Sequence, residues 1–488
     1  MSAEGTPLTS APEPRSWLPR VFTPVDIAPL VCFRIFFGAM MLYYVVSAAL
    51  DSWIDFFYVR PDFHLTYPGF GWVRPWPGNT MYLHFGVMGL SATTIMLGLC
   101  YRASAFVFWL TFTHTFLIEK AIYQNHYYLI CLISGIMIFV PAHRAASIDA
   151  FFKPQIRSVT VPVIWLWLLR LQLGIPYFYG GLAKLNYDWL HGMPMTLWLG
   201  RRTQLPYVGE WLAHEWAPLF FSYGGLLYDL LVVPALLWRR TRLVAYIASV
   251  AFHLTNHVLW DIGIFPWFMI GATLLFFPPR QFRRLFGLRA IRTPQDVPGD
   301  VTVTRRQKGL AVVIGVYVAW QLLFPFRHYL YPGDVNWTEE GHHFAWHMML
   351  REKDVAVRFF VFDPDTGKRG LLKISDFLNE RQLSRMGKDS DMILEFVHHV
   401  RDHYAEHGRN IEIRVLTLTS LNGRKPQLMI ATNLDYTQVE RRWGPQPWIL
   451  PLTEPLRPEG WSVPLSQWEQ ILADQIPDDM ELGTGGGI

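Results

Sequence analysis

Long apolar runs dominate the first two thirds of this 488-residue chain. They lie mainly between residues 27 and 325, whereas residues 326–488 have the mixed composition of a water-exposed domain. Charged residues make up 17% of the chain, against about a quarter in a typical soluble protein. The chain is therefore expected to fold as a polytopic α-helical membrane bundle followed by a mixed, β-rich extracytoplasmic domain.

A helix that crosses a bilayer needs about 20 mostly apolar residues. Nine segments are candidates for such spans, at roughly 27–50, 81–99, 105–118, 127–140, 159–182, 218–238, 243–260, 262–278 and 309–325. Lysine and arginine concentrate in alternate loops, which by the positive-inside rule predicts a cytoplasmic N-terminus. The predicted organisation is a cytoplasmic segment 1–26, a helical domain 27–325, an outer domain 326–475 and a disordered tail 476–488.

The outer domain carries turn signals between β-rich segments. Asp363-Pro364-Asp365-Thr366-Gly367 separates two such segments, and Asn422-Gly423 separates another two, so each pair is expected to form a hairpin. Residues 390–407 have the periodicity of an amphipathic helix and precede a glycine, Gly408.

One lysine stands at the end of an apolar, aromatic run, in Gly180-Gly181-Leu182-Ala183-Lys184-Leu185. An ionisable group at membrane depth is a functional-site hypothesis by default. A lysine that desolvation keeps neutral is a usable base. A lysine at a helix end also commonly extends to the lipid headgroups, so both interpretations stay open.

Further polar residues fall on the same predicted side of the membrane. Asn125 and His126 open the fourth span, His253 and His257 lie four residues apart on one helical face, and His328 follows the ninth span. Their convergence predicts a polar cavity in the outer half of the bundle, open toward the outer domain. The alternative is that each histidine satisfies a local backbone group.

Several functions lack their sequence signals. There is no phosphate-binding glycine loop and no nucleophile elbow. His253 and His257 have metal-ligand spacing but lack the glutamate of the zinc-protease pattern, so no metal is expected. The formal net charge of +4 is small, and no nucleic-acid partner is expected.

A series of short motifs occurs in a fixed order along the chain: Gly98-Leu99-Cys100-Tyr101-Arg102, Gln124-Asn125-His126, Gly181-Leu182-Ala183-Lys184-Leu185, Phe252-His253, Pro325-Phe326-Arg327-His328-Tyr329-Leu330, Asn336-Trp337-Thr338, Trp346-His347-Met348-Met349 and Gln446-Pro447-Trp448-Ile449-Leu450-Pro451-Leu452. With these motifs the chain resembles the vitamin K-dependent gamma-glutamyl carboxylases, including shorter relatives with the HTTM membrane domain. The resemblance covers roughly residues 20–460.

The family resemblance implies an enzyme that uses reduced vitamin K (the hydroquinone), oxygen and carbon dioxide to convert protein glutamate into gamma-carboxyglutamate, with linked epoxidation. Lys184 would be the base that deprotonates the hydroquinone, with His126 as a second catalytic residue. The implied cofactor-binding residues are Asn125, His126, His253, His257 and His328, and the implied substrate-binding residues are Trp346, His343 and Arg351. The implied partners are a glutamate-containing protein or peptide and the lipid bilayer.

Two other functions are compatible with the sequence. One is a quinol-oxygenating enzyme with a different acceptor, and the other is a non-enzymatic membrane protein that binds quinone or lipid. Low cysteine use (three residues) and the lack of an ER sorting signal favour a bacterial inner membrane as the location, with the outer domain in the periplasm.

Overall fold

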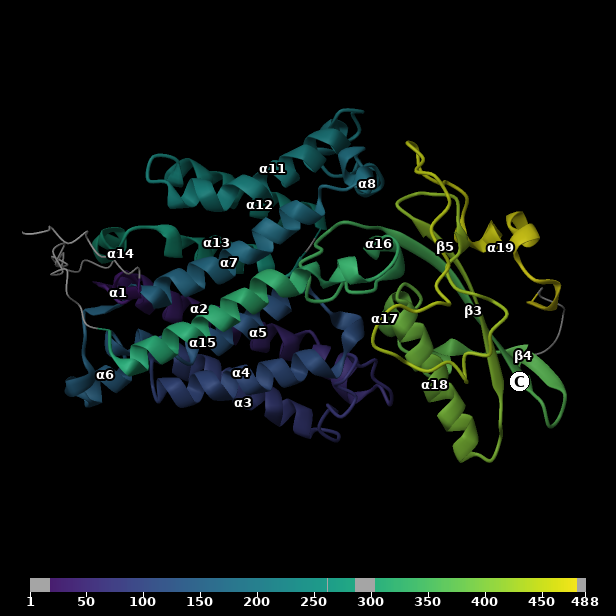
Figure 1. The fold of residues 1–488 in the computed structure, drawn as a ribbon, viewed down its shortest axis with the longest axis horizontal. Helices are drawn as coiled ribbons and strands as arrows, with labels where there is room; N and C mark the ends of the chain where they lie inside the picture. Colours follow the sequence, from purple (N-terminus) through teal and green to yellow (C-terminus); the bar gives the residue numbers. More distant parts are fainter. Residues whose placement is uncertain (1–17, 261, 286–302, 481–488) are drawn as a thin grey trace, which may run out of the picture.

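The computed structural model describes residues 18–260, 262–285 and 303–480. Long helices form one bundle, and the C-terminal domain lies against one end of it (Figure 1). Nine helices of the described residues correspond to the predicted apolar segments: α2 (Ala28–Leu50), α3 (Thr80–Leu97), α4 (Tyr101–Ile118), α5 (Asn125–Met137), α7 (Val163–Ala183), α11 (Ala217–Leu237), α12 (Arg242–Trp260), α13 (Phe265–Thr273) and α15 (Arg305–Leu323).

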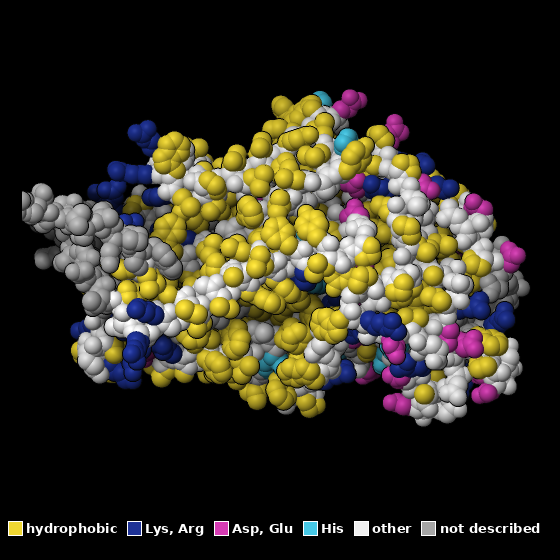
Figure 2. Space-filling view, viewed as in Figure 1, with side chains coloured by type: hydrophobic (Ala, Val, Ile, Leu, Met, Phe, Trp, Pro, Cys, Tyr) yellow, Lys and Arg dark blue, Asp and Glu magenta, His cyan; other side chains and the backbone are white. Residues whose placement is uncertain are grey.

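Fewer of these helices qualify as membrane spans than the sequence analysis expected. Five segments in the described part of the chain are long and apolar enough to cross a bilayer: α2, α3, α11, α12 and Arg305–Leu330, which contains α15. Helix α5 has 13 residues and α13 has 9, both short of the roughly 20 that a span needs. The expected nine spans are therefore not confirmed. Apolar side chains cover much of the visible face of the bundle (Figure 2).

Close helix packing in the bundle depends on small residues and on satisfied charges. A Cβ added at Gly38 of α2 would lie 2.6 Å from the backbone nitrogen of Met96 in α3, so only glycine fits there. Arg34 of α2 is fully buried, and its guanidinium donates to the carbonyl oxygen of Ala146 at 2.6 Å. This placement follows the rule that a charge within a span faces the protein interior.

The outer domain is built on an antiparallel sheet with strand order β4-β3-β5-β6. Its strands are β3 (Lys353–Asp363), β4 (Lys368–Leu371), β5 (Glu412–Leu421) and β6 (Gln427–Leu428). Both predicted hairpins are present, because β3 pairs with β4 and β5 pairs with β6. Asn422 and Gly423 turn the second hairpin with φ values of 50° and 74°, the left-handed region that Asn and Gly tolerate best.

A different segment of the chain packs on each face of this sheet. Helix α18 (Ser390–Glu406) packs its apolar side on Phe359 of β3 and on Ile413 of β5. The predicted helix is thus confirmed, and Gly408 follows it at φ 71°. On the other face, Trp468 and Met480 pack against β5. Residues 476–480, which the sequence assigns to a disordered tail, are instead part of this packing. The rest of that predicted tail, residues 481–488, lies outside the described residues.

Short elements connect the long ones. They include β1 (Pro24–Asp26), β2 (Thr160–Pro162), the turn Lys120–Ile122, α8 (Tyr187–Leu190), α9 (Met195–Gly200), α10 (Gly209–Leu212), α14 (Pro279–Leu285), α16 (Val335–Thr338), α17 (Glu380–Met386), the turn Leu465–Gln467 and α19 (Trp468–Ile471).

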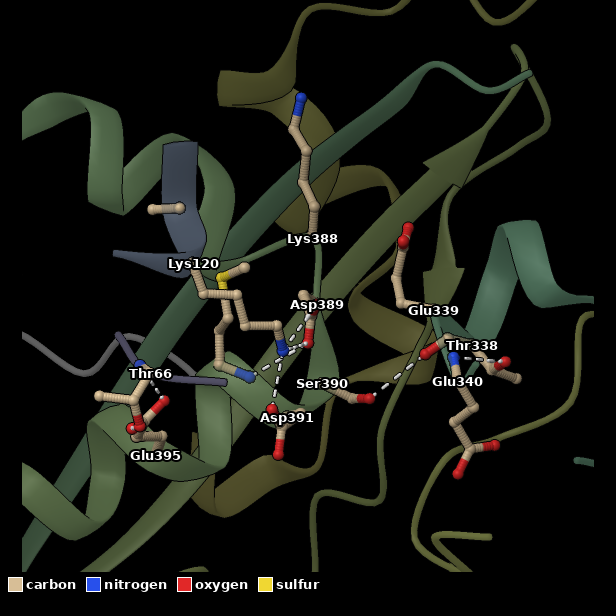
Figure 3. A network of polar contacts seen from close by, with 12 residues as sticks. Thr66, Lys120, Thr338, Glu339, Glu340, Lys388, Asp389, Ser390, Asp391 and Glu395 are labelled. Carbon is tan, nitrogen blue, oxygen red and sulfur yellow. Dashed lines mark hydrogen bonds and ion pairs between the residues drawn. The ribbon is translucent and has the colours of Figure 1, made fainter. Parts of the chain in front are cut away.

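Buried ion pairs join the outer domain to the bundle. The Lys120 ammonium lies 3.1 Å from Asp389 and 2.7 Å from Asp391, at the start of α18 (Figure 3). On the other side of the junction, Arg424 makes two hydrogen bonds of 2.6 and 2.7 Å to the carboxylate of Asp188 in α8. Because breaking one partner of a buried pair typically costs about 3–5 kcal/mol, these contacts hold the two parts in a defined relation.

Candidate functional site

Lys184 directly follows α7 and is 5% exposed. Its Nζ donates to Asp229 Oδ2 of α11 at 2.7 Å and to the carbonyl oxygen of Gly180 at 3.3 Å. The indole ring of Trp189 lies 5.1 Å from the same nitrogen. Lys184 therefore does not extend to the headgroups. The carboxylate also changes the expected chemistry, because a buried ammonium that has a charged partner is not forced by burial alone to be neutral.

The residues before Lys184 explain how the amine and the carboxylate come so close. A Cβ added at Gly180 would lie 2.8 Å from the Met348 side chain and 3.3 Å from Asp229 Oδ2. A Cβ added at Gly181 would lie 2.7 Å from the side chain of Leu230. The two glycines thus let α7 and α11 approach, and they leave room for the loop of the outer domain that carries Met348.

The Lys184–Asp229 pair lines an apolar cavity of about 410 Å³. His253 of α12 also lines it; its Nε2 contacts the Tyr177 hydroxyl at 2.8 Å, and its buried Nδ1 has no hydrogen-bond partner among the described residues. The remaining walls are mainly aromatic and aliphatic: Trp189, Phe220, Phe221, Tyr228, Phe252, Trp260, Phe265, Met195, Met269, Met348 and Met349. This cavity, hereafter the apolar cavity, offers few polar groups in a large apolar surround.

A second cavity of about 820 Å³ lies between the bundle and the outer domain, and we call it the polar cavity. Asn125 and His126 line it from the start of α5. The Asn125 side chain accepts from the Tyr123 hydroxyl at 3.0 Å and donates to the carbonyl oxygen of His347 at 3.3 Å. The His126 ring stacks on Phe265 with centroids 5.4 Å apart.

Positive charge is in excess around the polar cavity. Its lining includes eight lysines and arginines: Lys120, Arg201, Arg202, Arg351, Lys353, Arg381, Arg385 and Lys388. Its three carboxylates already have partners. Glu339 pairs with Arg351 and Lys353, Glu352 with Arg201, and Asp389 with Lys120.

Four of the lining cations therefore remain without an ion pair among the described residues: Arg202, Arg381, Arg385 and Lys388. The side chain of Lys388 points away from the Lys120–Asp389–Asp391 cluster (Figure 3). Burial lowers the pKa of Arg385 to about 10, which still leaves it charged at neutral pH. The cavity is thus suited to an anionic ligand.

Histidines of the outer domain contribute little charge to this cavity. Burial, assisted by nearby cations, holds the pKa of His342 and of His343 well below the usual range. Burial lowers the pKa of His347 to about 3. All three rings are therefore neutral hydrogen-bonding groups at physiological pH.

The two cavities share one wall. Trp260, Ile262, Phe265, Met348 and Met349 line both of them. The loop that supplies the methionines is strained, because Phe344, Trp346 and Met349 have φ values of 61°, 61° and 54°. Non-glycine residues in this region cost about 1–3 kcal/mol each and cluster at functional sites. Methionine side chains adapt their shape readily.

The predicted site residues divide between these cavities. Lys184 and His253 line the apolar cavity, whereas Asn125, His126, His343 and Arg351 line the polar one. The structure thus has two adjoining cavities where the sequence analysis expected one polar cavity.

Three predicted site residues line neither of the two. Trp346 packs on Tyr128 with centroids 4.9 Å apart, and His257 contacts Trp267. The Nδ1–H group of His328 donates to the carbonyl oxygen of Pro325 at 2.8 Å, and the ring faces His347.

Sequence reasoning missed the partner of Lys184 and the unmatched cations. Asp229 was visible as a charge inside an apolar run, and such a charge is expected to pair within the bundle. Arg381 and Arg385 are four residues apart and so share a helical face. Neither signal names a partner, which is why these residues were not assigned to the site.

Comparison with known protein families gives two matches. The HTTM domain matches residues 22–280, and the lumenal domain of vitamin K-dependent gamma-carboxylase matches residues 306–455. The second match begins before the last predicted span. No solved structure matches the chain. The two domains together account for most of the chain, so it is a multi-pass membrane protein with an extracytoplasmic C-terminal domain, and it belongs to the vitamin K-dependent gamma-carboxylase family.

Proposed function

We propose that the protein is a gamma-glutamyl carboxylase that couples oxidation of reduced vitamin K by oxygen to addition of carbon dioxide to protein glutamate. The observation that carries the proposal is the buried Lys184–Asp229 pair in an apolar cavity that shares a wall with a cation-rich cavity. One cavity suits a flat apolar ring with ionisable hydroxyls, and the other suits a carboxylate.

The residues of the apolar cavity fit reduced vitamin K. A volume of about 410 Å³ is within the roughly 300–1,000 Å³ typical of small-molecule sites. Aromatic walls suit a naphthalene-type ring, and the buried His253 Nδ1 that lacks a partner can bond to a ring oxygen. Lys184 and His253 would contact the polar groups of such a ring, and Trp189, Tyr228 and Phe252 are among the apolar residues that would surround it.

When bound, reduced vitamin K supplies an oxidisable hydroquinone whose reaction with oxygen generates a base strong enough to remove a glutamate gamma-proton. For this step the proton of the resting pair would move from Lys184 Nζ to Asp229 Oδ2, 2.7 Å away, and the neutral Nζ would then accept a hydroquinone proton. Proton transfer by a positioned side chain typically contributes about 10²–10⁴-fold to a rate. The apolar walls exclude water, which protects a strong base from quenching.

In the polar cavity, Arg381, Arg385 and Lys388 would hold the substrate carboxylate by charge-assisted hydrogen bonds. Asn125 and His126 lie at the shared wall, on the polar side of Phe265. They would orient the glutamate side chain toward the apolar cavity. The adaptable methionines 348 and 349 would move aside when substrate is present.

The proposed orientation has a cytoplasmic N-terminus in a bacterial inner membrane. Lysine and arginine side chains gather at the end of the bundle opposite the C-terminal domain (Figure 2). Arg144, Lys153, Arg157, Arg239, Arg240, Arg280 and Arg284 are among the loop cations. Such an excess is typical of the cytoplasmic side.

The test is an assay of the purified protein with reduced vitamin K, oxygen, labelled bicarbonate and a glutamyl peptide. The proposal predicts fixed label and vitamin K epoxide, both dependent on the quinol. Epoxide without label on any glutamyl peptide would favour a quinol-oxygenating enzyme with another acceptor. Quinone binding with neither product would favour a carrier and contradict the proposal.

A further inference from the structure

A third hollow of about 500 Å³ follows strand β3 of the outer domain. Its floor is residues 353–358 of the strand. Leu383, Ser384 and Gly387, at the end of α17, form one wall, and Leu465, Ser466 and Glu469 form the other. We call this hollow the edge groove, because it lies between two walls along the edge of the sheet that faces away from β5.

The edge of β3 in this groove is unpaired. Strand β4 pairs only with Phe360–Asp363, whereas β5 pairs with Lys353–Phe362. Hydrogen bonds of antiparallel strands alternate in direction. The Asn422 amide donates to the Glu352 carbonyl on the β5 side, and the Leu372 amide donates to the Phe359 carbonyl on the β4 side. The odd-numbered residues of β3 therefore direct their backbone N–H and C=O groups away from β5.

By this alternation, the amide and carbonyl groups of Val355 and Val357 point into the groove. Neither residue has a backbone hydrogen-bond partner there among the described residues. An unpaired strand edge is a template for another extended chain, and proteins usually cover or block it. Here it is left open between two walls.

The edge groove continues into the polar cavity. Lys353, Ser384 and Lys388 line both hollows. Of these residues, Lys388 is the cation that has no ion pair among the described residues. Its side chain points away from the Lys120–Asp389–Asp391 cluster (Figure 3). At about 3.3 Å per residue, a strand over Lys353–Arg358 spans about 16–17 Å, so a chain laid on the edge leads directly to the anion-binding cavity.

We propose that the edge groove binds the polypeptide that flanks the target glutamate, in extended form, as a strand added to β3. This inference rests on the proposed carboxylase function. The backbone groups of Val355 and Val357 would bond to the bound chain and supply affinity that does not depend on its side chains. Leu383 and Leu465, on the two walls of the groove, would contact apolar side chains of the bound chain. Lys388 favours a chain that carries acidic residues. Continuity with the polar cavity is the reason to assign substrate to the groove, rather than a second copy of the chain.

The test compares two peptide substrates with the detergent-solubilised full chain. One is a blocked glutamyl tripeptide, too short to reach the groove, and the other is a 12-residue peptide with β-branched residues flanking one glutamate. The variant is Val357→Pro, which removes an outward amide while the β5 ladder keeps its bonds. Its matched control, Val357→Thr, keeps the amide. A second variant, Ser466→Trp, narrows the groove from the opposite wall.

The proposal predicts that Val357→Pro and Ser466→Trp raise KM for the long peptide about 5- to 10-fold, as expected for loss of one or two hydrogen bonds. Val357→Thr changes it less than 2-fold. KM for the tripeptide stays within 2-fold in all three variants. Equal KM values for the long peptide in wild type and both blocking variants would overturn the proposal.

Amide hydrogen exchange of the wild-type protein gives a readout that needs neither turnover nor a folded variant. The amides of Val355 and Val357 are predicted to exchange rapidly alone and to become protected by the 12-residue peptide, but not by the tripeptide. Asp354 and Ala356 are predicted to be protected throughout. Absence of added protection would overturn the groove assignment, even if the enzyme is active. Turnover of neither peptide, with protection retained, would overturn the carboxylase proposal and leave the groove in place.

Two other occupants have distinct signatures. Protection of Val355 and Val357 that rises with protein concentration would assign the edge to a second copy of the chain. Protection that is lost when the chain is truncated after residue 480 would assign it to the chain's own C-terminal segment. Either result would overturn the substrate assignment.

Discussion

Replacing Asp229 with asparagine removes the carboxylate from the Lys184 ammonium while keeping the size of the side chain. The two side chains are 7% and 5% exposed, and Nζ and Oδ2 are 2.7 Å apart. Removal of one partner from a buried ion pair typically costs about 3–5 kcal/mol, because the other charge stays buried without compensation. We therefore expect Asp229→Asn to destabilise the protein by that amount.

The measurement is thermal unfolding in detergent, combined with a double-mutant cycle. The cycle compares wild type with Lys184→Met, Asp229→Leu and the double variant that combines them. Each single variant should be destabilising, whereas the double variant should recover most of the loss, because replacing both charges by apolar groups is often near neutral. The control is Tyr228→Phe, at a residue in the same helix as Asp229. It removes a hydroxyl that donates to Ser249 Oγ of α12 at 2.9 Å, and it should cost about 1 kcal/mol.

The cycle also has a clear contrary result. A coupling energy below about 0.5 kcal/mol would mean that the two groups act independently. Lys184 and Asp229 would then not form the buried ion pair on which the proposed site depends, and the Asp229 carboxylate would not stabilise the Lys184 ammonium.

Three further predictions address the cavities and the outer domain. His253→Phe is expected to raise KM for the quinol about 10-fold by removing a hydrogen bond, whereas His257→Phe, outside both cavities, should change it less than 2-fold. Arg385→Gln is expected to raise KM for a glutamyl peptide about 10- to 100-fold, the worth of a bond to a charged group, and an unchanged value would remove Arg385 from the substrate site. Burial lowers the pKa of His347 to about 3, whereas the pKa of an unfolded histidine is about 6.5. Above pH 6.5 the ring is neutral in both states. As the pH falls from 6.5 toward 3, only the unfolded state gains the proton, so the free energy of unfolding decreases. That loss amounts to roughly 4–5 kcal/mol, and unfolding temperatures at pH 7 and pH 4.5 should therefore differ less in His347→Gln than in wild type.

Local sequence signals were sufficient for much of the fold. The turn residues Asp363–Gly367 and Asn422-Gly423 select their hairpins by local backbone preference, and Asp389 and Gly408 bound α18 for the same kind of reason. Apolar segments located the bundle helices. They did not establish the number of spans, because α5 and α13 are too short to cross a bilayer straight and depend on tertiary packing for their placement.

The site was only partly accessible from the sequence, because its decisive contacts are long-range. Lys184 was identifiable as a lone charge at the end of an apolar run. Its partner Asp229 is 45 residues away, and pattern alone does not choose that residue over other internal charges. The division into two cavities depends on Met348 and Met349, which come from the outer domain and are held by an unusual backbone conformation. No helix or strand periodicity predicts such a loop.

The most direct test of the central claim is the rate of vitamin K epoxide formation by Lys184→Ala at saturating quinol, oxygen and glutamyl peptide. If Lys184 Nζ accepts the hydroquinone proton, the rate should fall about 10²–10⁴-fold, while the affinity for the quinol changes only a few-fold. Epoxide formation at the wild-type rate in this variant would contradict the assignment of Lys184 as the base.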